Sequence, residues 1–111
     1  MHELAVTQSI LEIALRHAEG VKRITQLNLV IGDLSSVVDD SVQFYWDIIS
    51  RGSVAEGARL HFERVRTRFQ CNECGEGFEP DGRVYTCPHC GSLQVTLVAG
   101  REFRLESIEV E

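Results

Sequence analysis

Residues 71–90 read CNECGEGFEPDGRVYTCPHC and contain every cysteine of this 111-residue chain. The cysteines form two C-x2-C pairs separated by twelve residues. Each C-x2-C turn presents two thiolates from one tight loop, and two such turns supply the four soft ligands of a tetrahedral zinc site. The predicted zinc ligands are Cys71, Cys74, Cys87 and Cys90.

A glycine follows each pair, at Gly75 and Gly91, where a positive φ lets backbone amides turn toward the sulfur atoms. Iron in a rubredoxin-like site uses similar loops, and spacing alone does not separate it from zinc. Two disulfides would need an oxidising compartment, and a thioredoxin-like role would need a single pair at a strand-to-helix junction. Four thiolates close the coordination sphere, so we predict a structural site.

The chain around the cysteine module predicts an α+β fold, in which two helices pack on a small three-stranded mixed sheet and the zinc ribbon is inserted before the last strand. A strand–helix–strand crossover favours parallel pairing of the first two strands. The predicted helices cover 3–19 and about 41–51, and the predicted strands cover 24–32, about 58–66 and 101–111. The predicted domains are 1–67 plus 100–111, an α/β domain, and 68–99, the zinc ribbon.

Hydrophobic periodicity assigns the faces of these elements. In the first strand, Leu27, Leu29 and Ile31 alternate with Gln26, Asn28 and Val30, which predicts a single buried face. Asp39 or Asp40 is the expected N-cap of the second helix. The predicted apolar stripe of the first helix comprises Leu4, Ile10, Leu11, Ile13, Ala14, Leu15 and Ala18.

Composition limits the classes of partner and compartment. The net charge is −6, from 11 basic and 17 acidic residues, which disfavours nucleic acid or an anionic membrane as the main partner. Residues 69–97 hold Arg83 as their one basic residue. No apolar stretch approaches the roughly 18 residues of a membrane span, and no signal peptide is expected. We therefore expect a cytoplasmic protein, in which thiols stay reduced.

The chain starts Met1-His2-Glu3, a second metal-binding pattern. A free α-amine, the amide nitrogen of His2 and its imidazole form adjoining chelate rings in one plane, an arrangement that suits Ni(II) or Cu(II). Glu3 adds a carboxylate or its amide nitrogen as a fourth donor. Without further context this pattern is most often a solvated N-terminus, in which Glu3 is a favourable acid in the first helical turn.

The remaining histidines and a group of arginines are weaker candidates. His17 lies near the end of the first helix, where a cation is favourable, His61 lies on the polar side of a strand, and His89 lies inside a cysteine loop that already has four thiolates. The alternating arginines are expected to form a solvated face paired with acids. These are Arg64, Arg66 and Arg68.

The whole chain resembles the HypA/HybF family of nickel metallochaperones for [NiFe]-hydrogenase maturation, some of which also serve urease. The resemblance rests on MHELAVTQSILEIAL at the start, LVIGDLS after the first strand, AEGARLHFERV before the first cysteine pair, and the cysteine spacing. The first pair, CNEC, lacks a proline that many members carry, while CPHC keeps it. The family's nickel motif falls on Met1, His2 and Glu3, and its zinc ligands fall on the four cysteines.

The resemblance implies a carrier of Ni(II) cargo with one structural Zn(II), and not an enzyme. Its implied partners are a HypB-like nickel GTPase and the hydrogenase large-subunit precursor, and the chain would act as a monomer or homodimer. The alternative hypothesis is a zinc-ribbon adaptor between proteins that transfers no nickel. No open metal site, nucleophile–base motif or phosphate-binding glycine loop indicates catalysis.

Overall fold

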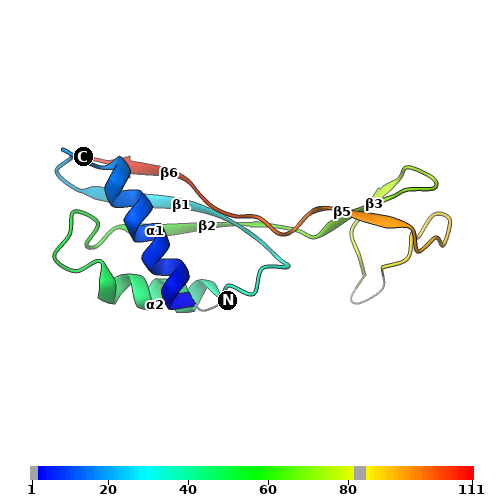
Figure 1. Ribbon diagram of the computed structural model, residues 1–111, viewed down its shortest axis with the longest axis horizontal. Coiled ribbons are helices and arrows are strands. Elements are labelled where there is room, and N and C mark those ends of the chain that lie inside the picture. Colours follow the sequence, from blue (N-terminus) through cyan, green and yellow to red (C-terminus); the bar gives the residue numbers. More distant parts are fainter. Residues whose placement is uncertain (1–2, 82–84) are drawn as a thin grey trace. The chain divides into compact units, whose positions relative to one another are not determined.

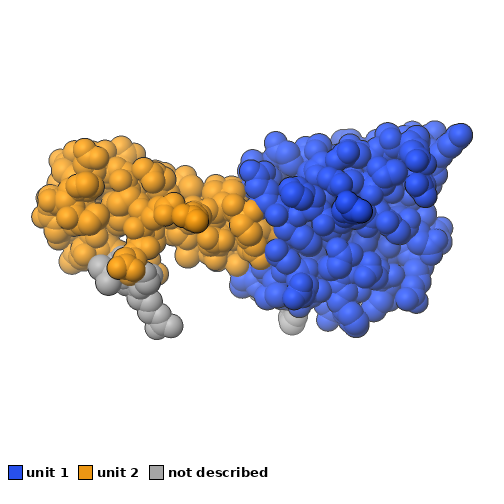
Figure 2. All heavy atoms as spheres, turned by 180° about the vertical axis from the view of Figure 1, so that it is seen from behind, with its two compact units in different colours: residues 1–30, 36–63, 103–111 blue, residues 31–35, 64–102 orange. Residues whose placement is uncertain are grey.

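A computed structural model describes residues 3–81 and 85–111. The chain forms two compact units, shown in blue and orange in Figure 2: residues 1–30, 36–63 and 103–111 make unit 1, and residues 31–35 and 64–102 make unit 2. Within the described ranges, no helix is long and apolar enough to cross a membrane. The elements in chain order are α1 (Glu3–His17), β1 (Ile24–Gly32), α2 (Asp39–Ile49), β2 (Arg59–Val65), β3 (Arg68–Cys71), β4 (Gly77–Phe78), β5 (Val95–Ala99) and β6 (Phe103–Val110) (Figure 1).

The first sheet has the strand order β2-β1-β6. The Ile24 N–H donates to the Val54 carbonyl (2.7 Å) before β2 begins, and the Asp33 N–H donates to the Val65 carbonyl (2.9 Å) where β2 ends. The two strands therefore run in the same direction, so β1 and β2 are parallel. This arrangement confirms the predicted crossover through α2.

Strand β6 runs the opposite way along the other side of β1. The Lys22 N–H donates to the Glu111 carbonyl (3.1 Å), and the Gly32 N–H donates to the Glu102 carbonyl (2.7 Å). The start of β1 thus meets the end of β6, as an antiparallel pair requires. The predicted three-stranded mixed sheet is confirmed.

Helix α1 packs against α2 and also contacts β6. Its buried residues are Val6, Thr7, Ile10 and Ala14. The predicted stripe was therefore wrong at Leu4 and Ile13, which are both 39% exposed. Because α1 packs against both α2 and β6, the helix face that begins at Val6 is the one that lies toward the core.

Two further details differ from the sequence predictions. Val30 was assigned to the polar face of β1 but is only 4% exposed, so the end of this strand is buried on both faces. Val38, not an aspartate, is the N-cap of α2 and makes no side-chain cap hydrogen bond. Asp39 and Asp40 instead lie in the first helical turn, where their charge favours the positive end of the helix dipole.

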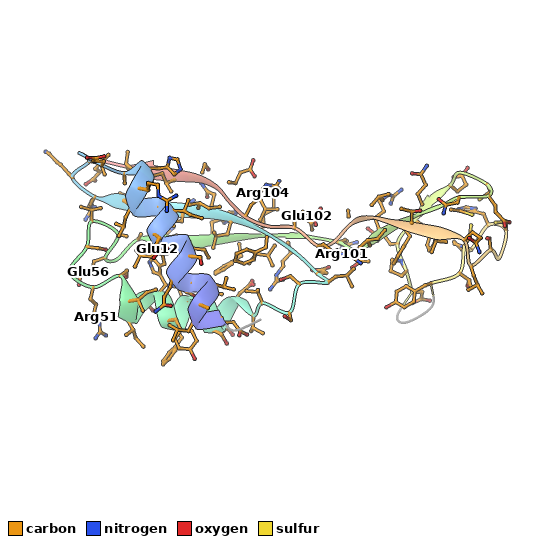
Figure 3. All side chains as sticks on the ribbon, viewed as in Figure 1. Glu12, Arg51, Glu56, Arg101, Glu102 and Arg104 are labelled. Carbon is orange, nitrogen blue, oxygen red and sulfur yellow. The ribbon has the colours of Figure 1, made fainter. Side chains whose placement is uncertain are left out.

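Three segments of unit 2 cross at two glycines. A Cβ on Gly32 would overlap the carbonyl of Gly100 and lie 2.7 Å from the Arg101 nitrogen. Gly100 itself has φ +122°, and its Cβ would lie 2.9 Å from the Thr67 Cα. The Gly100 N–H donates to the Glu102 Oε1 at 2.8 Å. Glu102 lies between β5 and β6 and is labelled in Figure 3. The crossing therefore requires glycine.

We predict that Gly32→Ala destabilises the protein by about 3 kcal/mol, because the new methyl group overlaps backbone that no side-chain rotation can move. Gly57→Ala is the control: unlike Gly32, Gly57 has a positive φ (+79°), and nothing lies within 4 Å of its Cβ position. The control should cost about 1 kcal/mol, from backbone strain alone. Urea denaturation measures both, and equal midpoints for the two variants would contradict the close approach.

Candidate metal centre

The cysteine module is built on a second sheet, of strand order β4-β3-β5. Strand β3 pairs antiparallel with both neighbours, which places Gln70 opposite Gly77 and Cys71 opposite Val95. The first cysteine loop thus connects two paired strands. Its first cysteine is the last residue of β3.

The first loop is closed by two backbone hydrogen bonds. The Cys71 N–H donates to the Glu76 carbonyl at 2.9 Å, and the Gly75 N–H donates to the Cys71 carbonyl at 3.0 Å. Gly75 has φ +80°. A side chain would be strained in this conformation, which explains the glycine after the pair.

The second loop repeats the same pattern. The Cys87 N–H donates to the Ser92 carbonyl (3.0 Å) and the Gly91 N–H to the Cys87 carbonyl (2.8 Å). Gly91 has φ +76°, so the positive φ predicted at both glycines is confirmed. The sequence analysis did not predict the roles of the Glu76 and Ser92 carbonyls. Both residues occupy the same sequence position relative to their cysteine pair, which could have indicated these roles.

The two loops bring all four sulfur atoms together, within 4.8 Å of one another. Cys71 Sγ lies 3.6 Å from Cys90 Sγ, and Cys74 Sγ lies 3.6 Å from Cys87 Sγ. A tetrahedron with metal–sulfur bonds of about 2.3 Å has sulfur–sulfur edges of about 3.8 Å. The distances between the four sulfur atoms therefore fit a tetrahedral zinc site with four thiolate ligands, the kind of site that the C-x2-C spacing predicted.

A small core supports one side of the cluster. Cys71 and Cys87 are buried together with Phe78, and Phe69 and Val95 pack against them. The rings of Phe69 and Phe78 stack with centroids 5.9 Å apart. The aromatic side chains of this module therefore pack against one another, as a module with few aliphatic residues requires.

The thiols differ in acidity. The Cys74 N–H donates to Cys71 Sγ (3.4 Å), and this bond is the main cause that lowers the pKa of Cys71 to about 6. For Cys90, the backbone amide of Ser92 lowers the pKa, but Cys71 and burial outweigh it and raise the pKa to about 12. The pKa of Cys74 is also raised: the Glu76 amide lowers it, but burial and neighbouring thiols prevail. Without a cation, the site does not hold four thiolates near neutral pH.

Among the predicted nickel ligands, Met1 and His2 lie outside the described residues. Glu3 is the first residue of α1 and is half-buried. Its carbonyl accepts a hydrogen bond from the hydroxyl of the buried Thr7 (2.5 Å). The assignment of these three ligands stays a prediction.

The weaker candidates are dispersed. His17 ends α1, while His61 and His89 are exposed on β2 and in the second cysteine loop. Among described residues, the cysteines form the one cluster of three or more His, Cys, Asp or Glu side chains suited to a metal. Histidine therefore adds no donor to a second cluster in this part of the chain.

The three arginines make different contacts. Arg66 pairs with Glu79 (3.5 Å), as the expectation of a face paired with acids requires. The Arg64 guanidinium donates a hydrogen bond to the backbone carbonyl of Gly32 at 3.4 Å. The Arg68 guanidinium lies over Gly77, so close that a Cβ there would be 2.8 Å from its Nη2.

Comparison with known proteins gives consistent matches. The family model described as "Hydrogenase/urease nickel incorporation, metallochaperone, hypA" matches residues 1–110. Hydrogenase maturation factor HypA from Caldanaerobacter subterraneus subsp. tengcongensis is 45% identical over 114 residues, and that from Geobacter metallireducens is 42% identical over 111, with full coverage of both chains in each case.

Solved structures agree with these sequence matches. A solution structure of HypA protein has a TM-score of 0.75 and 25% identity, covering 100% of this chain and 97% of the other. The nickel metallochaperone HypA from Helicobacter pylori has a TM-score of 0.66 at 24% identity, covering 99% and 97%, and shows the same fold.

We predict that zinc affinity falls as the pH falls, because protons compete with the metal for thiolates. Binding must displace protons from at least Cys74 and Cys90, whose pKa values are raised. Two displaced protons weaken apparent affinity about 100-fold on going from about pH 8 to about pH 7. Competition with a chromophoric chelator measures this slope, and an affinity independent of pH would contradict binding through these thiols.

Proposed function

The chain belongs to the HypA family of hydrogenase/urease nickel incorporation metallochaperones, and from this premise we propose that it binds Ni(II) at its N-terminus and delivers the ion for [NiFe]-hydrogenase maturation. The family consists of metallochaperones, not enzymes. The observation that carries the proposal is a family match that spans residues 1–110 and so includes the N-terminal motif. The proposed nickel ligands are Met1, His2 and Glu3.

Backbone chemistry supports the N-terminal assignment. Planar nickel coordination uses amide nitrogens, which must be free of other hydrogen bonds before they lose a proton. The first four N–H groups of an α-helix have no acceptor within the helix. Because α1 begins at Glu3, the Glu3 nitrogen is in this group. The start of α1 is therefore compatible with metal binding by the residues that precede it.

We assign zinc to Cys71, Cys74, Cys87 and Cys90. The sulfur cluster fits this ion, and four thiolates leave no coordination position for a substrate. When bound, zinc supplies the positive charge that allows the four thiolates to coexist. The cysteine loops themselves fix the ligand positions through their repeated backbone hydrogen bonds.

Delivery is proposed to proceed by ligand exchange in the cytoplasm. A site with few protein ligands can pass its metal to an acceptor by stepwise displacement of donors. The proposed acceptors are a HypB-like nickel GTPase and the hydrogenase large-subunit precursor. The relatives are named for hydrogenase maturation, so hydrogenase is the first client to test and urease the second.

We predict that His2→Ala abolishes nickel binding, because the imidazole completes the chelate, and leaves one zinc per chain. Isothermal titration with untagged protein and elemental analysis measure the two metals. His17→Ala is the control, since His17 lies at the far end of α1. Acetylation of the Met1 amine should weaken nickel binding as His2→Ala does. Unchanged nickel affinity in His2→Ala would favour the adaptor hypothesis.

A transfer assay tests delivery. The nickel-loaded protein should load a metal-free hydrogenase large-subunit precursor in the presence of the HypB-like GTPase, followed as nickel in the separated precursor. His2→Ala should transfer at least about tenfold less while keeping its zinc. Equal loading by both proteins would show that nickel reaches the precursor without the N-terminal site.

A further inference from the structure

The four cysteines of the sulfur cluster fall into two pairs by exposure. Cys71 and Cys87, the first cysteine of each loop, are 1% and 2% exposed, whereas Cys74 and Cys90, the second of each loop, are exposed. Neither loop is therefore buried or exposed as a whole, since each contributes one buried and one exposed cysteine. One side of the cluster faces the small core of the module and the other faces solvent.

Neighbouring side chains explain the protection of the first pair. Phe78, itself 6% exposed, is buried in one cluster with Cys71 and Cys87, and Phe69 and Val95 pack on this cluster. An attacking molecule must approach a sulfur along one of its lone pairs. The core residues cover Cys71 and Cys87 and leave at most 2% of either residue exposed to such a molecule.

Backbone contacts anchor the same pair. Cys71 is part of β3, and its N–H is bonded to the Glu76 carbonyl, as the Cys87 N–H is to the Ser92 carbonyl. Amide N–H groups bond to sulfur in both pairs, from Cys74 to Cys71 Sγ (3.4 Å) and from Ser92 to Cys90, so the pairs differ in the bonds of their own backbone groups and not in these. Cys74 and Cys90 lie in turns, outside the strands. The backbone hydrogen bonds that close each loop are therefore made by its first cysteine, and its second cysteine lies in the turn between them.

We propose that Cys74 and Cys90 form an exchange edge, at which the zinc site opens to thiol-directed electrophiles and competing soft-metal chelators, while Cys71 and Cys87 anchor it. This inference rests on the zinc assignment made above and goes beyond it, because a closed coordination sphere alone treats the four ligands as equivalent. The ligand class is small and thiophilic.

The reaction with a maleimide defines the expected chemistry. The zinc-bound thiolate adds to the carbon–carbon double bond, a sulfur–carbon bond forms, and water supplies the proton to the adjacent carbon. No group leaves the reagent. The product is a neutral thioether, which binds zinc weakly, so the first addition at the exchange edge should release the ion.

The test is limited alkylation of the zinc-loaded protein with N-ethylmaleimide, with adducts located by fragmentation mass spectrometry and zinc release followed with a chromophoric chelator. The same protein unfolded in urea without metal gives the intrinsic reactivity of each thiol. Relative to that reference, Cys71 and Cys87 should be protected at least about tenfold more than Cys74 and Cys90. Zinc release should coincide with the first adduct.

Two variants separate shielding from intrinsic reactivity. Phe78→Leu removes part of the core cover and should accelerate alkylation of Cys71 and Cys87 several-fold, with the exposed pair unchanged. Tyr85→Leu is the matched control: Tyr85 also packs on Phe69, with ring centroids 5.4 Å apart, but is 44% exposed. It should leave the order of reactivity unchanged.

Equal protection of all four cysteines in zinc-loaded protein would overturn the exchange edge and leave the zinc assignment intact. Protein that binds no zinc would overturn both. Nickel titration of the same sample reports separately on the N-terminal site, so failure of nickel binding is distinguishable from either result.

Discussion

Four thiolates within 4.8 Å of one another repel each other strongly, and the cysteine module can hold them only together with a cation. The same module has a small buried core, consisting of Cys71, Phe78 and Cys87 with two partly buried neighbours. Such a core supplies little of the free energy needed to order the chain. Metal binding and folding of this module are therefore coupled, as in other small zinc-binding units.

The mixed sheet differs from the cysteine module, because buried hydrophobic side chains stabilise it. Its central strand β1 has both faces buried near its end, where Leu29, Val30 and Ile31 are all at most 4% exposed. Directly after these residues the chain reaches Gly32, where the backbone of Gly100 comes too close for any side chain. Hydrophobic burial and backbone crowding thus follow each other along one strand, and both limit substitution there.

Much of this architecture could be predicted from the sequence, because its signals are local. The alternation in 24–32 gave the bounds of β1, and the repeated C-x2-C-G pattern gave the metal cluster and both positive-φ glycines. Errors arose where a second neighbour decides the outcome. The buried stripe of α1 depends on packing against α2 and β6, and the burial of Val30 depends on what covers the second face of the sheet.

The unequal exposure of the cysteines also depends on tertiary neighbours. The two loops share one local pattern and nearly identical backbone hydrogen bonds, and in both the first cysteine is buried and the second is exposed. The difference arises because Phe78, on the strand after the first loop, covers one cysteine from each loop. A tetrathiolate that is symmetric in its ligands is thereby asymmetric in its reactivity. For a protein whose proposed cargo is Ni(II), the distinction matters, because a protected anchor pair can hold zinc while the exposed pair meets other soft ligands.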